Sequence, residues 1–346
     1  MRSKNVVAKA KPFALVQREI AAVRNHITAM VRKSDNVVLD HAGKYVLEGE
    51  GKLLRPALVA LMAHACLPPE VSAAIQEVPI PSLDYMHVTA NAHDIRRYLR
   101  LAEVTELIHT ASLVHDDVID DSSTRRGRPA LHTEIGTKKA VLAGDFLLAR
   151  ASYWIATLDT PEIVLRMTEA LENLTAGELL QLDGCFDIPS YLNKSYCKTA
   201  SLIDKSLSST AVLAGNRTYV DPAGSYGQHL GIAFQIVDDC LDVTGTEDNL
   251  GKPKLSDMKE GIATLPCLLA AKREPLVDAI VRRRFANPGD PELALERVLA
   301  LGTVAEALQM ADKHCEMAVA ALGALHPSPA RDALGQVVHV VLTRQS

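Results

Sequence analysis

Two clusters of aspartates lie on apolar, helix-like stretches of the sequence. One sits in LVHDDVID and the other in FQIVDDCLD. The six residues are Asp116, Asp117, Asp120, Asp238, Asp239 and Asp242. Side chains four apart on a helix share a face, so each cluster presents two carboxylates one turn apart. Carboxylates held this close repel each other unless a cation lies between them, and two such clusters therefore predict a shared cation site.

Basic residues accompany both clusters. Lys52 and Arg55 share a face at the start of an apolar helix, where cations oppose the helix macrodipole, so we expect them to face an anion. Arg125 and Arg126 follow the first cluster in a loop, and arginine suits bidentate binding of phosphate oxygens. Lys252 follows the second cluster in GKPK. Taken alone, each basic pair could equally be an exposed surface pair.

His109 lies two turns before Asp116, and so on nearly the same face of the predicted helix. A single histidine on such a helix is usually an ordinary core or surface residue. The position of His109, however, favours contact with any ligand that the aspartate cluster binds.

The carboxylates and cations together predict a metal-bound diphosphate. Mg²⁺ prefers oxygen ligands and is usually held by one or two carboxylates plus substrate phosphates. The sequence has no Ser-His-Asp set, no phosphate-binding glycine loop and no GxGxxG, so acyl transfer, nucleotide hydrolysis and hydride transfer lack support. The chemistry that remains is ionisation of the C–O bond of the diphosphate, with metal ions stabilising the leaving group.

The elements that carry these residues are predicted to be helices. Apolar residues make up 48% of the chain and aromatic residues only 4%, with Ala and Leu abundant, which favours helix over strand. We expect a flexible basic tail at 1–12 and one all-α domain at 13–346, a large bundle with a central active-site cavity. Four prolines in 67–98 predict an inserted loop or lid there, with at most a short helix.

Composition also limits which partners and which cellular compartment we expect. A net charge of −5 argues against nucleic-acid binding, and no apolar run approaches the ~20 residues that cross a bilayer. The six cysteines form no CxxC pair, which favours free thiols in a reducing compartment. The basic N-terminal residues are consistent with a short tail or with the remnant of an organellar targeting peptide. We expect a soluble protein, in the cytoplasm or in an organelle such as the mitochondrion.

Four ordered motifs resemble those of the trans-isoprenyl diphosphate synthases. They are GKLLRP at 51–56, DDVID followed by RRGRP, KTA at 198–200, and FQIVDDCLD followed by GKPKLSD. The resemblance spans about 13–343, and GDFLLARASYWIA and GELLQL look most like the long-chain, solanesyl-type members. It implies an isoprenoid-synthase bundle, a homodimer, and an enzyme that makes a polyprenyl chain for a quinone.

The reaction that the resemblance implies is sequential head-to-tail condensation of isopentenyl diphosphate onto an allylic primer, farnesyl or geranylgeranyl diphosphate. Three Mg²⁺ ions would act with substrate bound, held by Asp116, Asp120, Asp238 and Asp242, the last directly or through water. The implied isopentenyl diphosphate ligands are Lys52, Arg55, His109 and Arg126. The implied allylic ligands are Arg125, Lys198, Thr199, Gln235 and Lys252. The resemblance makes Asp116, Asp120, Asp238, Lys198 and Gln235 the catalytic candidates, with Asp117 and Asp239 as outer supports.

Two positions depart from the family pattern. Leu53 replaces the usual arginine of GKRxRP, which should matter little if its side chain points away. Ile262 stands where shorter-chain members often have the lysine of GKxTLP, which leaves one fewer cation near the allylic diphosphate. The second departure favours the long-chain branch.

Product length can be argued from the residues one turn before the first cluster. Ala111 and Ser112 are small there, whereas an aromatic residue would block a tail running down the bundle. The helix from Glu103 to Asp120 could line roughly 25 Å, room for more than four isoprene units. The alternatives are a short-chain synthase and a non-catalytic subunit, the latter disfavoured by the intact aspartates. A terpene cyclase is disfavoured because its Asn/Ser/Glu pattern is missing.

Overall fold

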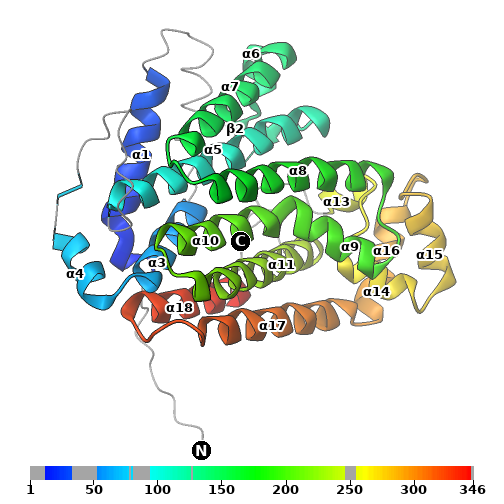
Figure 1. Cartoon of the computed structure of the whole chain (residues 1–346). Coiled ribbons are helices and arrows are strands. Elements are labelled where there is room, and N and C mark those ends of the chain that lie inside the picture. The colour runs from blue at the N-terminus through cyan, green and yellow to red at the C-terminus, as the bar shows by residue number, and fades with distance from the viewer. Residues whose placement is uncertain are drawn as a thin grey trace, which may run out of the picture.

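The computed structural model describes residues 12–32, 53–77, 79–80, 94–125, 128–245 and 255–343, and helices make up most of them (Figure 1). The described strands are β1 (Thr124–Arg125) and β2 (Arg128–Pro129), which pair antiparallel. The N-terminal half contains α1 (Gln17–Arg32), α3 (Leu54–Cys66), α4 (Pro69–Glu77), α5 (Ile95–Ile119), α6 (Leu131–Ile135), α7 (Thr137–Ala156) and α8 (Pro161–Asp183). The remaining helices are α9 (Ile188–Ser195), α10 (Ser201–Leu213), α11 (Val220–Thr244), α13 (Ser256–Lys259), α14 (Leu265–Ala271), α15 (Pro275–Arg282), α16 (Asp290–Ala300), α17 (Thr303–Leu322) and α18 (Pro329–Thr343). The predicted all-α fold is confirmed.

The long helices form a layered bundle. Figure 1 shows α8, α10, α11 and α17 running side by side, and α8 packs on α10, α10 on α11 and α11 on α17. α5 packs on α7 and also contacts α3 and α10. A continuous cluster of buried apolar side chains extends from Val16 to Val341 and fills the space between these helices. The two aspartate-bearing helices, α5 and α11, therefore both border the same core.

Helix boundaries follow local signals in the sequence. α5 begins after Asp94, whose side chain accepts a hydrogen bond from the backbone N–H of Arg96 at 3.0 Å. α8 begins with Pro161 and ends at Gly184, which has a left-handed φ of +90°. Proline suits the first helical position and glycine the residue after the last turn, so both ends of α8 follow from the sequence.

The segment 67–98 contains helical structure at both ends. α4 occupies Pro69–Glu77, the short helix that the sequence allowed, and α5 starts at Ile95. Residues 81–93 lie outside the described part of the chain, as do residues 1–11 of the predicted tail. Of the helices that the structure describes, none combines the length and the apolar character needed to cross a membrane.

Candidate active site

The first aspartate cluster is at the C-terminal end of α5 and divides between two environments. Asp117 is buried, and its Oδ1 accepts a hydrogen bond from Nε of Arg125 at 2.6 Å. Asp116 and Asp120 are partly exposed on another face of the helix. Neighbouring residues on a helix point in different directions, so Asp117 anchors the loop while the other two face outward. This geometry fits the supporting role expected of Asp117, and it engages Arg125, an expected substrate ligand.

Asp116 and Asp120 lie in a site with excess negative charge. The pKa of Asp116 is raised to about 7, chiefly by burial and also by the charges of Glu178 and Asp120, while the charge of Lys198 opposes the rise. Burial also raises the pKa of Asp120, again with Glu178 adding to the rise and Lys198 reducing it. A bound cation would favour the ionised form of both carboxylates. Their oxygen donors suit Mg²⁺, so these residues fit the metal that the sequence predicts.

The second cluster, on α11, shows the same division. Asp238 is exposed, whereas Asp239 is fully enclosed and accepts hydrogen bonds from the Tyr191 hydroxyl at 2.6 Å and from Nε2 of Gln235 at 2.8 Å. Burial raises the pKa of Asp239. Asp242 is buried, and its Oδ1 accepts a hydrogen bond from Ser256 at 2.8 Å. Asp238 is thus the carboxylate of this cluster that is open to a ligand.

Lys198 and Thr199 connect α8 with α11, the helix of the second aspartate cluster. They lie in a π-helical segment, Tyr196–Ala200, between α9 and α10. Nζ of Lys198 lies 2.5 Å from Oε2 of Glu178 on α8, and Thr199 donates a hydrogen bond to Oε1 of Gln235 on α11 at 2.7 Å. π-helical turns inside longer helices are frequent at functional sites.

Two glycines allow neighbouring helices to approach this segment. A Cβ added at Gly177 of α8 would lie 2.8 Å from the backbone N of Lys198. A Cβ added at Gly231 of α11 would lie 2.5 Å from Cα of Ala200. Because both contacts are with backbone atoms, a larger residue could not be accommodated by a side-chain rotation. The glycines therefore set how closely α8 and α11 bring their polar groups to Lys198 and its neighbours.

A third glycine, Gly144 on α7, leaves room for a side chain of α5, the helix that carries the first cluster. Nε2 of His115 on α5 lies 3.1 Å from the carbonyl oxygen of Val141 on α7. A Cβ added at Gly144 would lie only 2.2 Å from the same imidazole nitrogen. The ring therefore occupies the space that glycine leaves on α7, immediately before Asp116 in the chain.

The expected ligands of isopentenyl diphosphate are only partly within the described residues. Arg55 on α3 and His109 on α5 are partly buried. Lys52 and Arg126 lie outside the described part of the chain, and so does Lys252, an expected ligand of the allylic diphosphate. Their assignments stay predictions.

The residues expected to control product length lie one turn before Asp116. Ala111 is fully buried in the core, and Ser112 is partly exposed and donates a hydrogen bond to the carbonyl oxygen of His109 at 2.8 Å. Leu53, the first departure from the family pattern, is buried at the start of α3 with a left-handed φ of +45°.

Three charged or polar residues of this region were missed in the sequence. Glu178 pairs with Lys198, the Tyr191 hydroxyl donates to Asp239, and Lys194 is buried beside Tyr191. The available signal was a charge in an apolar helical stretch, as in GELLQL and YLNKSY. Such a charge must have a partner or a ligand, because burying an isolated ion is costly.

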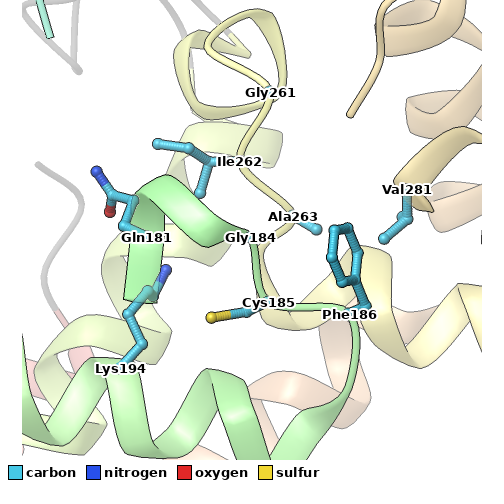
Figure 2. Close-up of a pocket in the computed structure, with 9 residues that line it drawn as sticks. All are labelled: Gln181, Gly184, Cys185, Phe186, Lys194, Gly261, Ile262, Ala263 and Val281. Carbon is cyan, nitrogen blue, oxygen red and sulfur yellow. The ribbon is translucent and has the colours of Figure 1, made fainter. Parts of the chain in front are cut away.

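A pocket lies beside this region, where the end of α8 meets α9 and residues 261–263 (Figure 2). It is small, with about 10 Å³ of room for water-sized molecules, and is partly open to solvent. Its lining residues are Gln181, Gly184, Cys185, Phe186, Lys194, Gly261, Ile262, Ala263 and Val281.

Within the described ranges, no three carboxylate, imidazole or thiol side chains form a ready metal site. Mg²⁺ usually takes only one or two carboxylates from a protein and completes its coordination with water and substrate phosphates. Asp116 and Asp120 could supply one such set, and Asp238 another.

Comparisons with known proteins identify clear relatives. The family model for Polyprenyl synthetase matches residues 36–298. Human all trans-polyprenyl-diphosphate synthase PDSS1 is 39% identical over 338 residues, which cover 96% of this chain and 77% of the human one. Solanesyl-diphosphate synthase 1, mitochondrial, from Oryza sativa subsp. japonica is 40% identical over 331 residues, 93% of this chain and 75% of its own. A crystal structure of polyprenyl synthase from Caulobacter crescentus CB15, complexed with calcium and isoprenyl diphosphate, has a TM-score of 0.82 at 29% identity and covers 97% of both chains.

Proposed function

The chain belongs to the polyprenyl synthetase family and is a prenyltransferase, and we propose that it makes a long-chain all-trans polyprenyl diphosphate. Relatives whose names specify solanesyl, hexaprenyl and decaprenyl products support the long chain, which would serve as a quinone side chain. The structural observation that best supports the proposed reaction is the position of Lys198. Its charge lowers the pKa of both Asp116 and Asp120. It also shares a short helical segment with Thr199, which donates a hydrogen bond to Gln235 on the helix of the second aspartate cluster.

The proposed reaction joins an allylic diphosphate to isopentenyl diphosphate. The allylic C–O bond breaks and its electron pair leaves with the diphosphate. The double bond of isopentenyl diphosphate then supplies the electrons of the new C–C bond, and a proton passes to the departing diphosphate. Bound Mg²⁺, held by Asp116 and Asp120 on one wall and by Asp238 and Asp242 on the other, would supply the charge stabilisation that this departure needs.

The protein groups around the allylic diphosphate are already organised by one another. Lys198 is held by Glu178, and Thr199 and Gln235 are hydrogen-bonded to each other. Gln235 also donates to Asp239, which fixes its amide orientation. Side chains held in this way lose little further freedom when the substrate binds, and well-oriented groups contribute strongly to catalysis.

The second substrate would bind through Arg55 and His109, with Lys52 and Arg126 from outside the described residues. Isopentenyl diphosphate keeps its diphosphate, so this site needs cations but no metal-assisted departure. Arg125 and Lys252 would complete the allylic side.

We also propose a homodimer, formed through α7 and α8. Large apolar side chains that are exposed are concentrated on these two helices, including Leu142 and Tyr153 on α7 and Leu165, Leu179 and Leu182 on α8. Exposed apolar patches of this kind mark interaction surfaces. A symmetric dimer would cover the same face of both copies. Leu165→Glu should give a monomer by sedimentation, and an unchanged dimer would place the interface elsewhere.

Product analysis tests the proposed reaction. Purified protein is incubated with Mg²⁺, labelled isopentenyl diphosphate and farnesyl or geranylgeranyl diphosphate, and the dephosphorylated products are resolved by length. A ladder that ends at about eight to ten units supports the proposal, where each condensation adds one unit. A stop at three or four units favours a short-chain synthase. A folded protein that gives no product favours a subunit that needs a partner, and Asp116→Asn is the inactive control.

A further inference from the structure

Glu178 on α8 is a buried carboxylate that is paired with an expected substrate ligand. The residue is only 8% exposed, and its Oε2 lies 2.5 Å from Nζ of Lys198. Its other carboxylate oxygen, Oε1, accepts a long hydrogen bond from Nε2 of Gln181 at 3.5 Å. Burying a carboxylate is costly unless a cation accompanies it, and here that cation is also the one expected to bind the allylic diphosphate. Glu178 and the diphosphate would therefore draw on the same positive charge.

The pairing of Glu178 with Lys198 is set by the packing of two helical segments. A Cβ added at Gly177, the preceding residue of α8, would lie 2.7 Å from Cγ of Lys198 and 2.8 Å from its backbone N. The backbone of α8 is thus in direct contact with the residue that Glu178 pairs with. An ion pair between two flexible surface side chains would need no such contact. The close approach therefore holds the carboxylate of Glu178 beside the ammonium.

Glu178 also adds to the negative charge around the first aspartate cluster. Burial is the chief cause of the raised pKa of Asp116 and of Asp120, and the charge of Glu178 contributes to the rise in both. The charge of Lys198 opposes the rise in both. Three carboxylates therefore act together against one ammonium, which leaves an excess of negative charge when all four groups are ionised.

The second cation that acts on this cluster is already balanced. Arg125 forms an ion pair with the buried carboxylate of Asp117 at 2.6 Å. Its charge therefore does little to offset the excess of negative charge. A site with this balance attracts cations and repels a diphosphate anion that arrives alone.

We propose that Glu178 makes the site selective for diphosphate that binds together with Mg²⁺. In the free protein its carboxylate holds Lys198 and adds to the negative charge of the aspartate cluster, so a metal-free diphosphate is repelled. Once Mg²⁺ balances that charge, the ammonium can donate to a phosphate oxygen and still keep its bond to Glu178, because it has three N–H donors. No covalent bond forms. This inference rests on the proposed function and adds a specificity-determining residue to it.

The test uses the full chain with three variants: Glu178→Gln, Glu178→Asp, and Glu169→Gln as a matched control. Glu169 lies on the same helix and also pairs with a lysine, Lys205 of α10, at 2.6 Å. The Kd for inorganic diphosphate is measured by calorimetry with all metal removed by a chelator. The Kd for Mg²⁺ alone is obtained from the rise of the melting temperature with Mg²⁺ concentration. Neither measurement needs turnover.

Glu178→Gln keeps the size of the side chain and an oxygen that can accept from Lys198, but it removes the negative charge. The Kd for metal-free diphosphate should fall by about tenfold and the Kd for Mg²⁺ should rise by about tenfold, the order expected for one neighbouring charge. Glu178→Asp keeps the charge, so both of its constants should stay close to those of the unchanged protein, as should those of Glu169→Gln. The opposite directions are decisive, because a general loss of packing would weaken both ligands.

Two outcomes would overturn the inference. One is a Glu178→Gln protein in which neither constant changes. The other is a Glu178→Gln protein that binds both ligands more weakly and melts at a lower temperature, which would mean that Glu178 only holds α8 against its neighbour. Should Glu178→Gln fail to fold, the unchanged protein decides: equal affinity for diphosphate with and without Mg²⁺ would refute the proposed selectivity, and clearly weaker metal-free binding would support it. An unchanged protein that makes no polyprenyl product, with the opposite shifts present in Glu178→Gln, would refute the proposed function alone.

Discussion

Replacing Ala111 by phenylalanine should convert the chain into a short-product enzyme. Ala111 lies five residues before Asp116, a distance of about 7.5 Å along α5. An isoprene unit adds four C–C bonds and, at about 1.5 Å per bond, is roughly 5 Å long when extended. A ring at this position therefore leaves room for about one or two units beyond the reacting carbon. Because each condensation adds one unit to a bound tail, we expect products of about two or three units, in place of a long ladder.

The stability cost of this substitution differs between the two candidate positions. Ala111 is fully buried, so the larger side chain must displace core atoms, at about 1–3 kcal/mol of unfolding free energy. Ser112 is partly exposed, so Ser112→Phe should cost less while blocking the same path one residue closer to the cluster. If both variants gave shorter products, the shortening would come from a blocked path for the tail and not from a general loss of core packing.

The assay should use geranyl diphosphate as primer, because a farnesyl tail already exceeds the expected space. Products are resolved by length after dephosphorylation, and the melting temperature of each variant is recorded. Ser112→Ala is the control, since it removes the hydroxyl that bonds to His109 without adding bulk. If both phenylalanine variants gave the same longest product as the unchanged protein, the tail would follow another path and the tunnel assignment would be wrong.

Two further predictions concern packing and pH. Gly144→Ala should destabilise the protein by about 1–3 kcal/mol and lower kcat, because its new Cβ would displace His115 beside the aspartate cluster. Gly335→Ala, on a helix where the new Cβ meets no atom within 4 Å, is its control in denaturation and turnover assays. Nδ1 of His229 lies 3.0 Å from Nδ1 of His314, and burial, with a smaller contribution from the charge of His229, lowers the pKa of His314 from 6.5 to about 4. The unfolded chain therefore binds protons that the folded chain does not, and stability should fall between pH 6.5 and 4, by about 1–3 kcal/mol. His314→Gln should reduce that slope in denaturation at several pH values, and an equal slope would contradict the argument.

The helices could be predicted from the sequence because their signals are local. Pro161 and Gly184 mark the two ends of α8 directly. The orientation of the aspartates was also predictable, since adjacent residues on a helix must point apart. Asp117 and Asp239 are accordingly buried and hydrogen-bonded, while Asp116 and Asp238 are more open.

The parts of the site that could not be predicted depend on contacts between distant segments. The π-helical segment that carries Lys198 forms where Gly177 and Gly231 let two other helices approach its backbone. Neither glycine is near that segment in the chain, so no local sequence pattern predicts the close packing. Glu178 was missed for the same reason, because its partner lies 20 residues further on and on another helix.

The charges of the site balance only when ligands are counted. Without ligands, Asp116 lies among other carboxylates, and burial raises its pKa to about 7, which means that its ionised form is disfavoured near neutral pH. Lys194 is a buried cation, and its charge counters the effect of burial on Asp239. A bound metal ion would favour the ionised form of Asp116 in the same way. The charges at the end of α5 therefore support the proposal that this acidic cluster acts with a bound cation.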